Sequence, residues 1–180
     1  MRTQDVPEAT FQCAEVKVEA GSVVLRGRVQ VTFPMPSQDE RLPQRMEEAV
    51  EDAGQKLKRL WFRELMEKAD AELVLQQRGG TQGAGVVCRG TSPMTFKTIF
   101  GTVAVRRRRV EHKADGTSEI PAASAWKTPQ QVTITQGLKD AACDAMPQES
   151  VTHSLERIDQ RAGEEGLLGH STLLKIVHEE

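Results

Sequence analysis

The first clear pattern is an alternation of apolar and polar residues. It covers residues 11–33, FQCAEVKVEAGSVVLRGRVQVTF, on either side of Gly21 and Ser22. A period of two is typical of a half-buried strand, so this segment predicts a β-hairpin with Val23–Phe33 as its return strand. The segment PMPSQ follows and ends the strand, because proline cannot donate to the ladder of a central strand.

A period of three to four residues replaces the alternation from Asp39 to Gln77 and predicts one long amphipathic helix, with Ser37 as its N-cap. The expected apolar stripe consists of Leu42, Met46, Val50, Ala53, Leu57, Leu60 or Trp61, Leu65, Ala69 and Leu73. Such a stripe either packs the helix on its own domain or pairs it with a second copy of the chain. A homodimer through this helix is therefore one candidate assembly.

The glycine-rich segment 78–92, RGGTQGAGVVCRGTS, has the composition of a phosphate-binding loop but not the motif. The P-loop lysine is missing, and Cys88 stands where the dinucleotide fingerprint has its third glycine. We therefore interpret the segment as a flexible connection.

Two further strands, Met94–Phe100 and Thr102–Val110, are predicted to form a hairpin in which Gly101 adopts the positive φ of the turn. If Phe100 pairs with Val103, one face of this hairpin is apolar and the other is mainly basic. The apolar face would hold Phe96, Thr98, Phe100, Val103 and Val105, and the basic face Lys97, Ile99, Ala104, Arg106 and Arg108. A second turn is expected at 114–117, ADGT, and an irregular segment at 120–129 with Trp126 as a core residue.

The last third of the chain is predicted to be helical. Helices are expected at 133–146, ended by Pro147, then up to Gly163, and finally from His170 or Ser171 onward. This arrangement is compatible with a helix-turn-helix, in which Ser171, Thr172 and Lys175 would face outward. The expected fold class is α+β, with regions at 1–36 (hairpin), 37–128 (long helix and arginine hairpin) and 129–180 (helix-turn-helix-like).

Composition limits the function classes. Of the 180 residues 38% are hydrophobic and 4% aromatic, and there is no tyrosine, so a modest core is expected. No apolar run approaches the roughly 20 residues of a membrane span, and the N-terminus lacks a signal-like stretch, which favours a cytoplasmic protein. Cys13, Cys88 and Cys143 are far apart without a CxxC pair, and we expect them to act as small apolar residues rather than disulfides or zinc ligands.

The four consecutive arginines Arg106–Arg109 stand out because the net charge of the chain is −2. Clustered guanidinium groups bind phosphate oxygens through their forked donors, whereas a solvated edge strand is the alternative explanation. The helical C-terminal region is acidic, so the arginine hairpin is expected to supply most of the attraction to DNA. The predicted DNA-binding residues are Lys97, Arg106, Arg107, Arg108, Arg109, Lys113, Ser171, Thr172 and Lys175.

Three segments carry a resemblance to a known family: FGTVAVRRRRV, IPAASAWKTPQQVTITQGLKDAACDAM and RAGEEGLLGHSTLLKIVHEE. Over roughly residues 40–180 the chain resembles the N-terminal region of bacterial ISKra-type insertion-sequence transposases. The resemblance implies binding of transposon-end DNA. In that family the region precedes an RNase H-like domain with acidic metal ligands, before which this chain ends. Many members carry cysteine pairs after the hairpin, whereas VEHKADGTSEI has none, so no zinc is expected.

No catalytic residue, metal or cofactor is expected in the chain itself. Asp140 and Asp144 share a helix face, but no aspartate on a strand stands opposite them, and a solvated helix face is the better interpretation. A separately encoded catalytic transposase half would then be a partner. The alternatives are a protein–protein or dimerisation module whose arginines pair with its own acidic helices, and a decayed transposase fragment without nucleic-acid binding.

Overall fold

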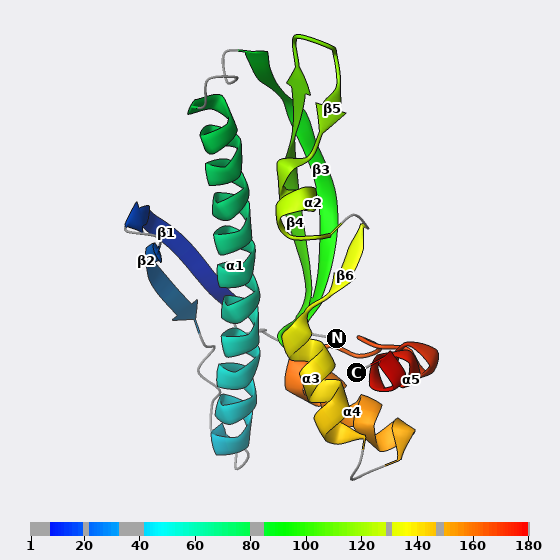
Figure 1. Ribbon diagram of the computed structural model, residues 1–180. Coiled ribbons are helices and arrows are strands. Elements are labelled where there is room, and N and C mark those ends of the chain that lie inside the picture. Colours follow the sequence, from blue (N-terminus) through cyan, green and yellow to red (C-terminus); the bar gives the residue numbers. More distant parts are fainter. Residues whose placement is uncertain are drawn as a thin grey trace, which may run out of the picture. The chain divides into compact units, whose positions relative to one another are not determined.

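The computed structural model describes residues 8–19, 22–32, 42–79, 85–128, 131–146 and 150–179, and it has a mixed α+β fold (Figure 1). The chain divides into two compact units, Met1–Trp61 and Phe62–Glu180, and the division falls inside the long helix α1, Leu42–Gly79. The region boundaries expected at 36/37 and 128/129 stay predictions. Each unit is described separately below.

The first unit holds a two-stranded antiparallel sheet and the beginning of α1. Strand β1, Glu8–Glu19, pairs with β2, Ser22–Thr32, and Glu19 lies opposite Ser22. The register shifts between Cys13 and Glu15, which marks a bulge in β1. The predicted N-cap Ser37 lies outside the described residues. In the first unit, exposed side chains of α1 form ion pairs between positions four residues apart. The Lys56 ammonium, for example, lies 2.7 Å from a carboxylate oxygen of Asp52.

In the second unit the predicted stripe of α1 is wrong by one position. The residues that pack against the sheet are Phe62, Met66 and Val74. Leu65, which was predicted to face inward, is 37% exposed. Both stripes fit a period of 3.6 residues, so the sequence pattern alone does not choose between them. The choice depends on which stripe complements the apolar face of the sheet.

The second unit is built on a four-stranded sheet with the order β5-β4-β3-β6. Strands β3, Val86–Thr98, and β4, Gly101–His112, form a long antiparallel ribbon beside the later part of α1 (Figure 1). Strand β5, Ser118–Glu119, pairs with β4 near His112, and β6, Val132–Ile134, runs parallel to β3 at 95–97. The middle of the ribbon is therefore two strands wide.

The turn of the ribbon differs from the predicted register. Thr98 lies opposite Gly101, so Phe100 is part of the turn and does not pair with Val103. Gly101 has the expected positive φ of 103°. The Thr98 hydroxyl donates to the Gly101 carbonyl at 2.8 Å and accepts from the Phe100 N–H at 3.0 Å. The observed register differs from the predicted one by an even number of residues. Phe96 and Val103 therefore still lie on the face that was predicted to be apolar.

Three segments adopt structures that the sequence pattern did not predict. The glycine-rich stretch was expected to be a flexible connection, but from Val86 onward it is already strand β3. The segment expected to be irregular contains the short helix α2, Pro121–Ala125, with its proline in the first turn. Thr133 and Ile134 were expected to begin a helix but belong to β6, whose length of three residues is too short for a visible alternation.

One face of the ribbon carries a small core. Met94, Phe96, Val103 and Val105 are buried there, and Phe62, Met66 and Trp126 pack against them. The rings of Phe62 and Phe96 meet edge to face with centroids 5.4 Å apart, and the centroids of Phe96 and Trp126 lie 6.3 Å apart. Trp126 is thus a core residue, as predicted. Helices α1 and α2 therefore cover the same face of the sheet.

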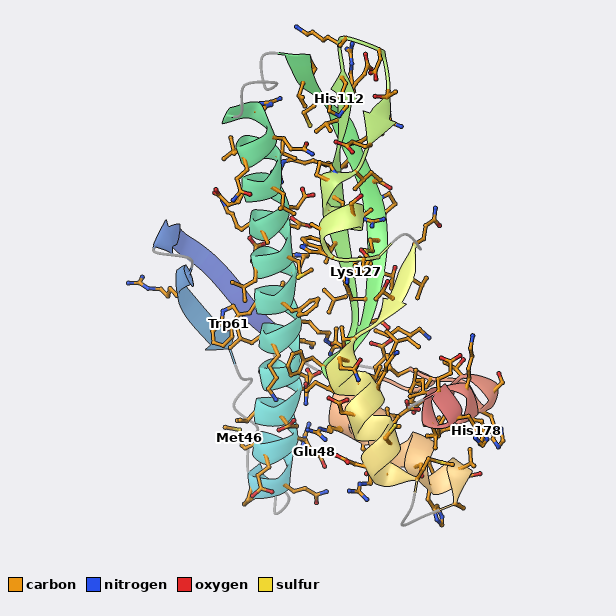
Figure 2. All side chains as sticks on the ribbon, viewed as in Figure 1. Met46, Glu48, Trp61, His112, Lys127 and His178 are labelled. Atoms are coloured by element: carbon orange, nitrogen blue, oxygen red, sulfur yellow. The ribbon has the colours of Figure 1, made fainter. Side chains whose placement is uncertain are left out.

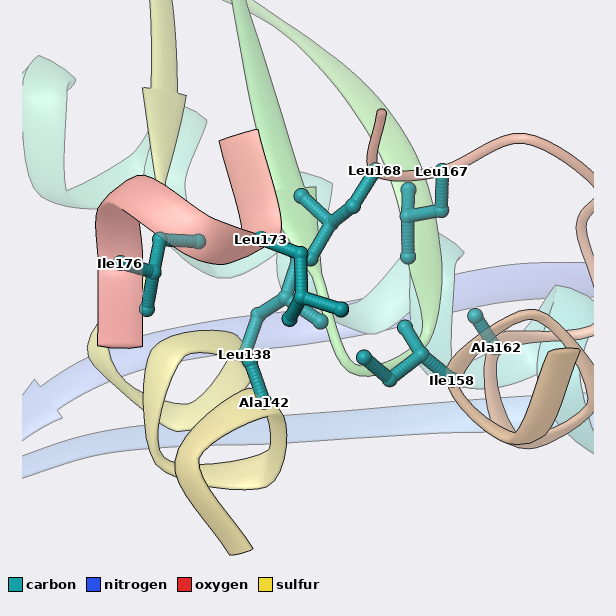
Figure 3. Packing of buried hydrophobic residues seen from close by; sticks show 8 residues of the cluster. All are labelled: Leu138, Ala142, Ile158, Ala162, Leu167, Leu168, Leu173 and Ile176. Atoms are coloured by element: carbon teal, nitrogen blue, oxygen red, sulfur yellow. The ribbon is translucent and has the colours of Figure 1, made fainter. Parts of the chain in front are cut away.

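The C-terminal helices enclose a second core, whose eight side chains converge in Figure 3. The helices are α3, Gln136–Ala145, α4, Val151–Ala162, and α5, His170–Glu179. Leu138 and Leu173 are 1% and 0% exposed, and such burial contributes about 1.5–3 kcal/mol for each leucine. Helix α4 begins with a Ser150 cap and ends at Gly163 with φ 63°, as predicted for this glycine.

Candidate nucleic-acid interface

The four consecutive arginines of β4 lie in different environments. Arg107 is buried, Arg108 is half-buried, and Arg106 and Arg109 are exposed. A plain strand would send alternate side chains to the same face, two inward and two outward. Here Val105, Arg107 and Val110 are buried, so the interval between buried positions lengthens from two residues to three.

Arg107 belongs to the interior of the second unit. It is 2% exposed, and its Nη1 donates to the Thr128 carbonyl at 2.9 Å. Burial lowers the pKa of its guanidinium, and the charge of Asp70 raises that pKa in part. Among the residues that the structure describes, its Nε has no hydrogen-bond partner. The expectation that Arg107 contacts DNA is therefore corrected, because a buried guanidinium does not reach a ligand at the surface.

Arg108 is held by α1. Its Nη1 lies 2.9 Å from an oxygen of Asp70, whose side chain is fully buried, and also donates to the Glu67 carbonyl. The same Asp70 carboxylate accepts the backbone N–H of Arg108 with both oxygens, at 2.9 and 3.1 Å. The desolvated carboxylate therefore needs Arg108 as its counter-charge, and Arg108 is bound to the fold rather than free for phosphate.

The carboxylates of α1 also protect the edge of β4. Glu67 accepts the backbone N–H of Arg106 at 3.1 Å, two residues before the N–H that Asp70 accepts. These N–H groups lie on β4 away from β3, where the short strand β5 does not reach. An unpaired strand edge is prone to aggregation, and covering it with a helix is a common protection. Side chains of α1 thus accept the backbone N–H groups of β4 that a neighbouring strand would otherwise pair.

A bulge in β3 accounts for the uneven exposure of the arginines. The register shifts between Cys88 and Thr91, so two residues of β3 lie opposite Arg109. One of them is Gly90, whose φ of 122° is accessible to glycine at little cost. A bulge increases the local twist, which rotates the following residues about the ribbon axis. Arg106 and Arg109 are consequently both exposed, although they lie an odd number of residues apart.

Arg106 and Arg109 are the two solvent-exposed arginines of this row. Among the described residues, no hydrogen bond or ion pair involves the side chain of Arg106 or Arg109. Lys113, at the turn after β4, is also exposed, and its backbone N–H donates to the Gly85 carbonyl at 2.7 Å. His112 marks this end of the ribbon in Figure 2 and lies 3.0 Å from Glu119. Three cationic side chains thus remain available along one strand and its turn.

Two other basic residues of the ribbon are committed elsewhere. The Lys97 ammonium donates to the Leu167 carbonyl at 2.6 Å, and the Thr102 hydroxyl and N–H donate to Glu164. These contacts attach the tip of the ribbon to the connection between α4 and α5. Arg89 pairs with Glu111 through two hydrogen bonds, which raise the pKa of its guanidinium. Lys97 therefore has a bond to the fold that its predicted role did not include.

The predicted contacts on α5 have mixed environments. Ser171 is exposed, Thr172 is half-buried, and Lys175 is exposed with Glu179 3.6 Å away. The stretch 163–169 joins α4 to α5 and is longer than the roughly three- or four-residue turn of a helix-turn-helix. Asp159 holds it by accepting the N–H groups of Gly166 and Leu167 at 2.7 and 3.1 Å.

The two aspartates considered as metal ligands, Asp140 and Asp144, are both exposed on α3. Asp140 accepts a hydrogen bond from Gln136 one turn earlier. Within the part of the chain that the structure describes, no three His, Cys, Asp or Glu side chains gather as they would around a metal ion. Cys143 is half-buried and Cys88 is exposed, and neither forms a disulfide, so an exposed Cys88 does not fit the small apolar role that we expected.

Sequence reasoning missed Asp70, which organises the arginines from the neighbouring element. Its signal is present in hindsight: it stands four residues after Met66 and four before Val74, in the middle of the stripe that faces the sheet. A carboxylate at an inward position of a helix is rarely buried without a cationic partner. The arginine row was the available partner, but the shifted stripe concealed the connection.

No protein-family model, curated protein or solved structure matches this chain. The described helices include none with the length and apolar character of a membrane span. The functional assignment therefore depends on the chemistry of the exposed side chains.

Proposed function

We propose that the chain binds DNA through the solvent side of the β3–β4 ribbon. The observation that carries the proposal is that Arg106 and Arg109 are exposed and their side chains have no partner among the described residues, while their neighbours Arg107 and Arg108 are held in place. Lys113 adds a third cation at the end of the same strand. Exposed guanidinium groups with unused donors suit phosphate oxygens, which accept two parallel hydrogen bonds.

The spacing of these side chains supports contacts along a phosphate backbone. Arg106 and Arg109 are three residues apart, which corresponds to about 10 Å along a strand. The neighbouring arginines are fixed by Thr128 and Asp70, so the strand that presents the exposed pair is rigid at this point. A rigid presentation lowers the entropy that binding costs.

The resemblance to ISKra-type transposases gives the proposal its biological setting. In this setting the chain is a DNA-binding portion of a cytoplasmic mobile-element transposase that recognises transposon ends, and a catalytic half supplies strand transfer. We assign no catalytic step to the residues of this chain. Helix α5 would add secondary contacts through Ser171 and Lys175, both of which are exposed. Thr172 is half-buried and is the weaker candidate on this helix.

The test is DNA affinity as a function of salt. Three phosphate contacts predict that the logarithm of the binding constant falls with the logarithm of salt concentration with a slope of about −3. Replacing Arg106 and Arg109 by alanine should reduce this slope to about −1 and weaken binding strongly at low salt. Fluorescence anisotropy with a labelled duplex measures both quantities.

A matched control removes the same charge from another surface. Lys68→Ala with Arg78→Ala also deletes two exposed cations, but from α1. This variant should keep most of the affinity and the slope of the original chain. Absence of salt-dependent binding at low ionic strength, or an equal loss in both double variants, would contradict the proposal.

A second candidate function is self-association through α1. Val50 and Trp61 are exposed on this helix at 57% and 40%, and both lie in the first unit. Large apolar side chains at such exposure favour an interaction surface when they share one side of a helix. Sedimentation equilibrium distinguishes this function, because a dimer forms with protein concentration and without DNA.

A further inference from the structure

The shape of the β3–β4 ribbon and its exposed side chains indicate which form of nucleic acid it fits. We infer that the ligand is double-stranded DNA and that the two-stranded middle of the ribbon enters its major groove. This inference rests on the proposed function, since it specifies the ligand of the same surface. It follows from three features of the ribbon: its width, the size of its exposed side chains and the location of its aromatic residues.

The width of the ribbon changes along its length. Strand β6 lies beside β3 only at 95–97, and β5 lies beside β4 only at 110–111. Between these points the sheet consists of β3 and β4 alone, with α1 packed on its apolar face and the side chains of Glu67 and Asp70 at the edge of β4, so only the opposite, solvent-exposed face can enter a groove. Two neighbouring strands lie about 4.8 Å apart, whereas the major groove of B-form DNA is about 12 Å wide and admits a two-stranded ribbon. A three-stranded sheet would be too broad to enter to the same depth.

The exposed side chains of this stretch are small apart from the arginines. Pro93 lies opposite Arg106, and Thr91 lies opposite Arg108; both are exposed. A hydroxyl, a proline ring and a guanidinium can approach base edges without a steric barrier from a bulky neighbour. Arginine in the major groove reads guanine through its O6 and N7 atoms, and a threonine hydroxyl pairs with either base type.

The aromatic residues of the ribbon exclude a different mode of binding. The only aromatic residue within β3 and β4 is Phe96, and it is 4% exposed in the core. Phe100 is half-buried in the turn. Proteins that bind single strands stack bases on exposed aromatic rings, and this ribbon presents none on its strands. Duplex RNA is excluded by geometry, because the major groove of A-form helices is too narrow and deep for side chains to read.

The inference is tested by competition among three ligands of equal length. Anisotropy titrations compare a DNA duplex of about 20 base pairs, its single strand and the corresponding RNA duplex, at one salt concentration. The DNA duplex should bind at least about tenfold more tightly than either alternative. Equal or tighter binding of the single strand or of duplex RNA would overturn the inference but leave the proposed function standing. Salt-dependent binding to none of the three would overturn both.

A substitution on the exposed face sharpens the test. Thr91→Phe keeps the net charge and the preference for strand, but adds a ring where the ribbon would enter the groove. Duplex affinity should fall about tenfold, whereas single-strand affinity should stay or rise because the ring offers a stacking surface. Gln76→Phe places the same ring at an exposed position of α1 and should change neither.

Ala104→Phe serves the same purpose should Thr91→Phe unfold, since Ala104 is exposed on β4 two residues before Arg106. A folded ring variant that binds duplex DNA as tightly as the original chain would show that the face stays outside the groove. Circular dichroism and thermal melting identify which variants are folded.

Discussion

On the side of the ribbon that faces α1, the side chains of Arg107 and Arg108 are bound by Thr128 and Asp70; on the solvent side, the side chains of Arg106 and Arg109 have no hydrogen-bond or ion-pair partner among the described residues. The same residue type thus has two roles within four consecutive positions. The difference lies in the neighbours, because Asp70 of α1 supplies a buried carboxylate to the Arg108 side chain, whereas Glu67 of α1 accepts only the backbone N–H of Arg106. A run of like charges in a sequence is therefore not evidence of one continuous charged surface.

The comparison also explains why the exposed pair can be effective. A row of four free arginines would repel one another and cost conformational entropy when bound to a ligand. Here the inner pair anchors the strand through bonds of 2.9 Å to the Thr128 carbonyl and the Asp70 carboxylate. The strand is thereby held against α1, and the outer pair projects from a fixed support.

The largest expected effect comes from Asp70→Ala. This change leaves Arg108 half-buried without its counter-charge and removes the acceptor of its backbone N–H. Breaking a buried pair by removing one partner costs about 3–5 kcal/mol in the free energy of unfolding. Urea denaturation followed by tryptophan fluorescence measures this loss.

The control for Asp70→Ala lies on the same helix. Asp52→Ala removes an exposed carboxylate that pairs with Lys56 one turn away, and should cost no more than about 0.5 kcal/mol. A loss from Asp70→Ala as small as that from Asp52→Ala would show that the inner arginines do not depend on α1.

The sequence predicted elements more reliably than their partners. The α+β class, the long helix, the glycine at the ribbon turn and the Gly163 cap all follow from local patterns, and the structure contains them. Local patterns do not determine which side of α1 faces the sheet. Stripes through Met66 and through Leu65 are both apolar, and only contact with Phe96 and Val103 selects the first.

The predicted site failed at Arg107 for a related reason. Alternation places Arg107 on the face of Val105, which the prediction had already identified as apolar and buried. The prediction assigned all four arginines to DNA because of their charge, although strict alternation required two of them, Arg107 and Arg109, to face inward. The partner that makes this burial tolerable, Asp70, comes from a different element, and a bulge at Gly90 is not visible as a local period.

A smaller effect is expected when the inner and outer arginines are exchanged for alanine one at a time. Arg107→Ala removes a buried hydrogen bond from a charged donor and leaves a cavity, so unfolding should become easier by about 2–3 kcal/mol. Arg106→Ala deletes an exposed side chain and should change stability by no more than about 0.5 kcal/mol.

The two variants should show the opposite order in DNA binding. Arg106→Ala should reduce the salt slope by about one, whereas folded Arg107→Ala should keep the slope of the original chain. The division into inner and outer arginines is incorrect if both variants reduce the slope equally. Temperature is kept well below the midpoint of Arg107→Ala, so that the loss of folded protein does not enter the affinity.

The smallest expected effect tests the bulge that separates the two sides. A Cβ at Gly90 would meet no atom within 4 Å, so Gly90→Ala adds only the strain of a φ of 122°, about 1–2 kcal/mol. Gly54→Ala is the matched control, because its Cβ also meets nothing within 4 Å, but the residue is helical and alanine should stabilise it by about 0.5–1 kcal/mol. Opposite signs in urea denaturation are therefore expected. If the bulge relaxes to a regular ladder, Arg109 turns toward the face of Arg107. DNA affinity in Gly90→Ala should therefore fall together with stability. A variant that loses neither affinity nor stability would show that the bulge does not direct the outer arginines.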